Sequence, residues 1–365
     1  MCIRDRGTFL EYPQPGFERV SEIQGHDEFW ERRQSDPWNR ADTAAFLRAR
    51  LLDLFLGDWD RHRGQWRWAR VPDERFLQPL AEDRDQVFCD FEGLAMTAAR
   101  ATGAQLVTFD PDYPSIDDGT QNGWDLDRFL LTDLDRAEWM RVAREAQKRL
   151  TDEVIEQGLR RLPPEYYALV GTDLAMILRV RRDGLVAHAE HYYDYLAKKV
   201  DVHGSNQSDL ATIRYLDDPK IEVQISLIDE KEPYYSRRFA KDETDEVRIY
   251  LHGGDNRVVV EGEDRVGIKI HIIGGDGPDV VETSERTDVE LWDFEGENQV
   301  VGDVRVHSSP YRDPGLRRPN EDVPWVPSRD FGRSVKPLAL FGYHPDAGLI
   351  MGAGVDVTHY GFREY

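Results

Sequence analysis

A change in hydrophobic spacing near Gly204 is the feature of this sequence that most constrains its fold. Before that point, apolar residues recur with the spacing of helices. From Leu210 to about Val306, short apolar segments are instead separated by Gly, Asp and Asn. The first pattern is typical of amphipathic helices, and the second of strands joined by tight turns. We therefore predict an α+β multidomain chain, with a mainly helical part over residues 7–203 and an all-β domain over residues 204–307.

The predicted helices have recognisable ends. Asp42 can cap a helix that runs to about Leu56, and Gly57 can end it. A second helix is predicted from about Asp135 to Arg161, because its apolar residues form one stripe and Pro163-Pro164 stops it. A further pair of helices is predicted at residues 172–182 and 184–199.

Strands are predicted in two places. A hairpin is expected at residues 66–71 and 76–80, with Trp66 and Trp68 in its core. The β-domain is expected to contain strands at residues 211–216, 221–228, 234–239, 246–251, 257–261, 267–273, 279–282, 288–293 and 299–306.

Both ends of the chain suggest an internal fragment of a longer protein. Residues 1–6 resemble an artefact of sequence assembly, so we exclude them from the fold. Residues 308–335 are rich in proline and are predicted to be a linker. From Leu349 to Val357, one face carries only apolar residues and the other carries mostly small or polar ones, with Ile350 as the exception. This alternation suits a membrane-spanning barrel strand, and it also suits a strand of a soluble sandwich.

Charge limits the partners of the chain. Its 47 Lys and Arg residues against 70 Asp and Glu residues give a formal net charge of −23. Such a charge opposes binding to nucleic acid or to anionic lipid, so we expect no nucleic-acid partner. A run of about 18 apolar residues, which a transmembrane helix needs, does not occur in the sequence.

Acidic residues gather on both sides of the predicted hairpin. The first group lies in the loop Gly57–Gln65, and the second is the segment Glu82–Asp85. In kinase-type phosphoryl transfer, one Asp accepts the hydroxyl proton, an amide further along the loop helps to hold a metal, and a later Asp bridges metal and phosphates. Asp60 stands where the base is needed and Gln65 where the amide is needed. The alternative is that these are simply solvated Asp-rich turns.

The run Gly57-Asp58-Trp59-Asp60-Arg61-His62 resembles the catalytic loop of atypical kinases related to spore-coat CotH, to HipA and to the secretory-pathway kinases. The resemblance implies a kinase-like C-terminal lobe over residues 7–203, with Mg²⁺ or Mn²⁺ and ATP as cofactors and a nucleotide or phosphorylated ligand as partner. The implied catalytic residues are Asp60, Asp58 and His62, the implied cofactor-binding residues are Arg61 and Gln65, and the implied metal ligands are Asp83, Asp85 and Gln65.

The wider sequence is similar to bacterial outer-membrane proteins of the BamA/TamA, or surface-antigen, type. The similarity lies in Gly57–Ala69, in Asp83–Phe88, in Tyr250–Gly254, in Ile272–Gly275 and in the alternating segment near the end. Some of those proteins carry a metallophosphoesterase domain and a kinase-like region before the barrel. The resemblance implies the periplasm and outer membrane of a Gram-negative bacterium as location. It also implies that residues 336–365 begin a truncated outer-membrane β-barrel.

Two departures from ordinary kinases motivate other functions. Gln65 stands in place of the usual Asn, and no Gly-rich loop with a following Lys precedes Asp60. One alternative is a catalytically inactive scaffold that links a periplasmic domain to an outer-membrane assembly or export barrel. Another is that a phosphoesterase-type domain carries the activity and this region only connects it to the barrel.

Two further patterns could hold metal ions. His188, His191 and His203 could form a cluster, but their spacing favours a solvated or core-edge position. Gly274–Val281 fits one copy of a calcium-binding glycine repeat, and Gly253–Asn256 fits a partial second copy. We expect tight turns between stacked strands here, and no calcium.

Overall fold

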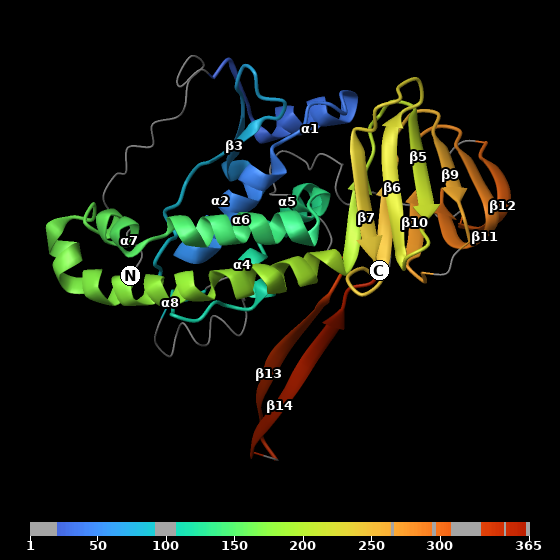
Figure 1. Ribbon diagram of the computed structural model, residues 1–365. Coiled ribbons are helices and arrows are strands. Elements are labelled where there is room, and N and C mark those ends of the chain that lie inside the picture. Colours follow the sequence, from blue (N-terminus) through green and yellow to red (C-terminus); the bar gives the residue numbers. More distant parts are fainter. Residues whose placement is uncertain are drawn as a thin grey trace. The chain divides into compact units, whose positions relative to one another are not determined.

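The computed structural model has an α+β architecture, as the sequence predicts (Figure 1). It describes residues 20–91, 107–263, 266–293, 297–307, 330–346 and 348–362. These residues belong to two units. The first covers residues 20–90 and 107–307, and the second covers residue 91 and the residues after 330. The predicted change near Gly204 is therefore a change of secondary structure within the first unit. Residues 1–6 and most of the predicted linker lie outside the described residues.

Helices form most of the first unit before Gly204. Helix α2, Thr43–Leu56, has the ends that the sequence predicts. The Asp42 side chain accepts a hydrogen bond from the Ala45 N–H, and Gly57 ends the helix in the left-handed conformation with φ 73°. The other described α-helices are α1 His26–Ser35, α4 Ile116–Thr120, α5 Trp124–Leu130, α6 Arg136–Arg149, α7 Asp152–Leu159 and α8 Pro164–Ala197.

Two helix predictions are wrong in their boundaries. The helix expected over residues 135–161 is two helices, α6 and α7, because Thr151 caps a new helix through its side chain. The pair expected at 172–182 and 184–199 is the single 34-residue helix α8. A glycine such as Gly184 costs a helix only about 1 kcal/mol, which the buried face of α8 can offset. None of the described helices is both long enough and apolar enough to cross a membrane.

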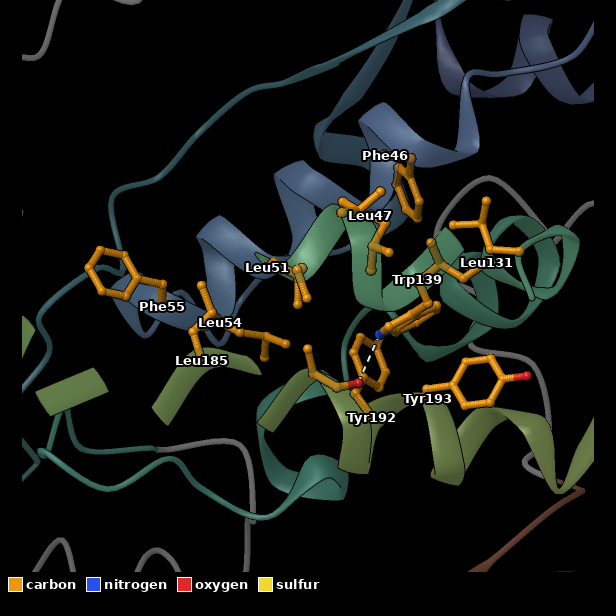
Figure 2. Close-up of a cluster of buried hydrophobic side chains, with 14 of the residues drawn as sticks. Phe46, Leu47, Leu51, Leu54, Phe55, Leu131, Trp139, Leu185, Tyr192 and Tyr193 are labelled. Carbon is orange, nitrogen blue, oxygen red and sulfur yellow. Dashed lines mark hydrogen bonds between the residues drawn. The ribbon is translucent and has the colours of Figure 1, made fainter. Parts of the chain in front are cut away.

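The core of the helical part joins α2, α6 and α8. Trp139 of α6 is buried, and its indole N–H donates a hydrogen bond of 2.8 Å to the Ala189 carbonyl of α8. This packing buries one face of α2 and holds its C-terminal end, where the acidic loop begins. Figure 2 shows the side chains around Trp139, which include Phe46, Leu47, Leu51, Leu54, Leu131, Leu185, Tyr192 and Tyr193.

A small antiparallel sheet follows the acidic loop. It consists of β1 Glu22–Gln24, β2 Trp66–Arg70 and β3 Gln78–Ala81 in that order, which confirms the predicted hairpin. Trp66 and Trp68 are buried, and the Phe29 ring stacks on Trp68 at a centroid distance of 4.3 Å. The two tryptophans therefore belong to the core, as predicted.

The large sheet has nine strands in the order β4-β8-β10-β11-β9-β5-β6-β7, with β12 beside β11. Two predicted strands, 279–282 and 288–293, are one strand in the structure, and the strand that follows α8 was not predicted. The remaining predictions are confirmed within a few residues. The strands are β4 Lys199–His203, β5 Asp209–Tyr215, β6 Lys220–Leu227, β7 Tyr235–Ala240, β8 Glu246–Tyr250, β9 Arg257–Glu261, β10 Lys269–Ile273, β11 Val280–Trp292 and β12 Gln299–His307.

Most strands of this sheet stack in parallel. One ladder contains β4, β8, β10, the end of β11 and the end of β12, and a second contains β5, β9 and the beginnings of β11 and β12. Each pass of the chain thus adds one strand to each ladder, as in a β-solenoid. Within the first ladder, aliphatic residues align and are buried, including Val200, Val247, Ile270 and Val289.

The glycine-rich turns stack together with the strands. The Asp276 N–H donates to the His252 carbonyl at 2.7 Å, so the turn at 274–278 lies against the turn at 251–255. Gly275 has φ 93°, and a Cβ there would lie 1.9 Å from the His252 carbonyl oxygen. Only glycine fits this contact. These are the tight turns between stacked strands that the sequence predicts.

The second unit is described as one antiparallel hairpin. Strands β13 Arg333–His344 and β14 Gly348–His359 pair without a break in register. The strand expected around residues 349–357 is confirmed, and its partner begins two residues before the predicted end of the linker. Apolar side chains of β14 are exposed, for example Leu349 at 67% and Val355 at 63%.

Candidate functional site

The acidic loop leaves the end of α2 and enters β2 through a short 3-10 turn, η2 Arg63–Gln65. Two hydrogen bonds lock this turn. The His62 Nδ1 atom accepts from the Gly64 N–H at 3.1 Å, and the Gln65 Oε1 atom accepts from the His62 N–H at 3.3 Å. His62 therefore acts as the cap of η2, and Gln65 is held in a fixed orientation.

A buried charge network lies beneath the loop and centres on Asp53 of α2. The Asp53 carboxylate accepts from Arg61 Nε at 3.0 Å, from Arg84 Nε at 2.8 Å and from Arg50 Nη1 at 3.4 Å. Arg50 also forms a two-pronged ion pair with Asp127 of α5 at 2.7 and 2.8 Å. The network thereby fastens the acidic loop and the Glu82–Asp85 segment to the same helix.

Arg61 and Asp58 belong to this inner network. Arg61 is 1% exposed, and its donors contact Asp53, Asp58, Gln65 and the Glu82 carbonyl. Burial raises the pKa of Asp58 to about 6, and the nearby Arg61 guanidinium partly opposes that rise. The geometry gives both residues a positioning role under the loop, whereas a direct role of either in catalysis or cofactor binding stays a prediction.

Asp60 points away from this network. Its Oδ1 atom accepts a hydrogen bond of 3.1 Å from Asn122 Nδ2, which also binds the Trp59 carbonyl at 3.1 Å. Burial raises the pKa of Asp60, His62 opposes the rise, and Asp85 and Asp83 add to it. The charges of Asp85 and Asp83 thus act on the Asp60 carboxyl.

Gln65 meets the second acidic segment directly. Its Nε2 atom lies 3.4 Å from Asp83 Oδ2, and its Oε1 atom accepts from Arg61 Nη1 at 3.3 Å. Asp83 has φ 52°, a left-handed conformation that is uncommon for residues other than glycine and is concentrated at functional sites. The fold thus places Gln65 against Asp83 from the two sides of the hairpin, and the charges of Asp83 and Asp85 act on Asp60.

Sequence reasoning missed the residues that support this site. Arg50 and Asp53 lie among the leucines of α2, and a helical pattern marks such positions as buried without naming their partners. The sequence did contain a clue to them, because two charged residues on a buried helical face need partners of opposite charge. The role of Asn122 could not be predicted in this way, because Asn122 lies in a polar turn before α5, where an asparagine is common.

The histidines considered as a possible metal cluster do not come together in the structure. His188 stacks on Tyr113 at 4.1 Å, and burial lowers its pKa to about 4. His203 pairs instead with His252, with 3.1 Å between their ring nitrogens. Among the described residues, no three His, Cys, Asp or Glu side chains are arranged to hold a metal ion.

No protein-family model, curated protein or solved structure matches this chain. The function of the site is therefore inferred from its own residues.

Proposed function

We propose that the acidic loop and the Glu82–Asp85 segment form a kinase-like site that binds a nucleotide or phosphorylated ligand through Mg²⁺ or Mn²⁺. The observation that carries the proposal is the contact of Gln65 with Asp83 across the hairpin, while the charges of Asp85 and Asp83 act on Asp60. Asp60 is the proposed base for phosphotransfer.

The residues fit a hard divalent cation. Asp83 would hold the ion, with Asp85 as the neighbouring carboxylate. Gln65 presents its Nε2 atom to Asp83, and its Oε1 atom accepts from Arg61 and the His62 N–H, so the Gln65 predicted as a metal ligand would instead position Asp83. Mg²⁺ often takes only one or two protein carboxylates and completes its shell with water and phosphate oxygens. The absence of a preformed trio among the described residues is compatible with that mode. A bound cation would neutralise charge on the phosphates.

The surroundings of Asp60 suit a base. Burial and the neighbouring carboxylates raise its pKa, which brings it closer to the range where proton acceptance is efficient. The hydrogen bond from Asn122 fixes the carboxylate orientation. Asn122 is therefore proposed as a positioning residue for Asp60.

Metal-dependent nucleotide binding is the first test. We expect calorimetry to detect Mn²⁺–ATP binding, and the double substitution Asp83→Asn with Asp85→Asn to weaken it by more than about tenfold. Asp60→Asn should instead reduce ATP turnover by about 10²- to 10⁴-fold with a small effect on affinity.

Asp73→Asn is the matched control, because Asp73 is exposed at the tip of the same hairpin and the substitution changes the charge equally. Equal turnover by the wild-type protein and Asp60→Asn would refute Asp60 as the base. A wild-type protein that binds no Mn²⁺–ATP would refute the site and favour the inactive scaffold.

A second proposal concerns the hairpin of β13 and β14, which we infer to be the first strands of an outer-membrane barrel. Both strands have 12 residues, and about 9 to 11 residues span a membrane as a tilted strand. One side of β14 carries Leu349, Met351, Val355 and Val357, which suits a lipid-facing surface. This placement would put the chain in the periplasm and outer membrane.

Cysteine labelling in outer-membrane fractions tests the barrel proposal. We expect Val355→Cys to be protected from a water-soluble maleimide until detergent is added, because it would face lipid. Asp356→Cys, the next residue on the opposite face, is the control and should be labelled without detergent. Equal labelling of both variants, above the parent chain, would argue against a lipid-facing side.

A further inference from the structure

A small, partly open cavity lies where the helical part of the first unit meets the large sheet. Its volume is about 20 Å³, and its lining includes Arg33 of α1, Arg40, Thr43 at the start of α2, His203 of β4 and Tyr235 of β7. We propose that this cavity binds a single small monatomic anion of the chloride class. The proposal is independent of the kinase-like site.

Two buried polar groups of the lining lack partners among the described residues. They are the Nη1 atom of Arg33 and the hydroxyl of Tyr235. Arg33 is 7% exposed and Tyr235 is 4% exposed, so bulk water does not solvate either group. A buried donor without an acceptor is costly, and such donors usually have an unseen partner. Both groups can donate a hydrogen bond, which calls for an acceptor in the cavity that both residues line.

The charge around Arg33 favours an anionic acceptor. Burial lowers the pKa of Arg33 to about 10, and the adjacent Arg40 guanidinium lowers it further. No ion pair of Arg33 occurs among the described residues, and its hydrogen bond goes to the His203 carbonyl at 3.4 Å. A buried guanidinium in this setting gains from a compensating negative charge.

The nearby carboxylates are already engaged elsewhere. Asp133, which also lines the cavity, forms an ion pair with Arg40. Asp209 accepts hydrogen bonds from the Ser205 N–H at 2.7 Å and the Ser205 hydroxyl at 3.2 Å. Both contribute favourable charge near Arg33 without contacting it as an ion pair.

The size of the cavity selects among ligands. A volume of about 20 Å³ admits one water molecule or one monatomic ion and excludes phosphate or nucleotide. Water is the rival occupant, because it can accept the same hydrogen bonds. Only a bound ion makes the stability of the protein rise saturably with halide concentration in a way that requires Arg33.

Thermal unfolding at constant ionic strength distinguishes the two occupants. We expect Tm of the wild-type chain to rise saturably by about 2 to 4 °C when sodium gluconate is replaced by chloride or bromide. Arg33→Gln should abolish this rise. Arg75→Gln, which alters an arginine whose side chain is 59% exposed in the same unit, should retain it.

A bromide-soaked crystal of the wild-type protein provides a second measurement if Arg33→Gln does not fold. An anomalous peak beside Arg33 Nη1 is expected. Equal Tm values in gluconate and chloride, a halide effect that persists in Arg33→Gln, or a cavity without a bromide peak would each overturn the proposal in favour of water.

Discussion

Replacing Asp279 with Asn is expected to stabilise the first unit at alkaline pH and to flatten the dependence of its stability on pH. Asp279 is 1% exposed, and burial raises the pKa of its carboxyl to about 7. Ionisation of this group in the folded chain is therefore costly. An Asn side chain keeps the shape and the acceptor oxygen but carries no charge.

The stacked turns explain why Asn fits at this position. Asp209, Asn256, Asp279 and Asn298 occupy equivalent positions in successive passes of the sheet. The Asp279 Oδ1 atom accepts from the Asn256 N–H at 3.1 Å and from Asn256 Nδ2 at 3.0 Å, and Asn298 Oδ1 accepts from the Asp279 N–H at 2.8 Å. Two neighbours in this ladder are thus already asparagines.

Asp293 supplies the remaining contact. A Cβ built on Gly274 would lie 2.4 Å from Asp279 Oδ2 and 2.2 Å from Asp293 Oδ2, so both carboxyl groups crowd the same glycine. Two carboxyls this close favour holding one proton between them. In the Asp279→Asn variant, the Nδ2 group of the new side chain could donate to Asp293 in place of that proton.

The sign of the pH effect follows from the raised pKa. Between the ordinary value of 3.8 and about 7, the folded chain binds the Asp279 proton more tightly than the unfolded chain does. This contribution is fully present below 3.8, is lost as pH rises, and is gone above about 7. At about 1.4 kcal/mol per pH unit, the difference amounts to roughly 4 kcal/mol at most.

Urea unfolding at about pH 5 and about pH 8.5 measures this effect. The gain of Asp279→Asn over the wild-type chain should be larger at the higher pH. Asp276→Asn, an exposed position in the same turn, is the control and should show little change at either pH. A gain from Asp279→Asn that is the same at both pH values would contradict a shared proton.

Arg61→Met is expected to lower the free energy of unfolding by about 3 to 5 kcal/mol, because removing one partner of a buried ion pair leaves the other charge uncompensated. Asp58 would lose its contact of 2.7 Å with Arg61 Nη2, and Asp53 would lose one of its three arginines. Gln65 would also lose the donor that orients it. We therefore expect weaker Mn²⁺–ATP binding in addition to lower stability.

Arg67→Met is the matched control for this network. The Arg67 side chain is 34% exposed and pairs with Glu82 at 3.3 Å, so its loss should cost at most about 1 kcal/mol. Equal destabilisation by the two substitutions in urea unfolding would show that the buried network contributes no more to stability than an exposed ion pair does. Full Mn²⁺–ATP affinity in a folded Arg61→Met protein would separate the network from the candidate site.

Local elements were the predictable part of the fold. The Asp42 cap and the Gly57 end of α2 depend on hydrogen bonds and dihedral angles within a few residues. The hairpin of β2 and β3 and most strands of the large sheet show their alternation directly in the sequence. The predictions failed where a local signal competed with tertiary packing. Gly184 was expected to separate two helices, but α8 continues through it because the buried face of the helix stabilises it.

The candidate site was also predictable only in part. The order of acidic loop, hairpin and second acidic segment can be seen in the sequence. That order was enough to select Asp60, Gln65, Asp83 and Asp85 as candidate site residues. Their meeting depends on the hairpin closing, and their orientation depends on Asn122 and the network around Asp53. Those partners lie far from the loop in sequence, so spacing could not identify them.

The sequence by itself determined the α+β class, the switch from helices to strands near Gly204 and the positions of the acidic groups, because periodicity and end signals act over short distances. Only the tertiary structure decided that the strands stack as parallel ladders, that Asp58 pairs with Arg61 while Asp60 pairs with Asn122, and that Arg33 lines a cavity. These outcomes depend on contacts between distant residues, where burial and charge compensation select one partner among many.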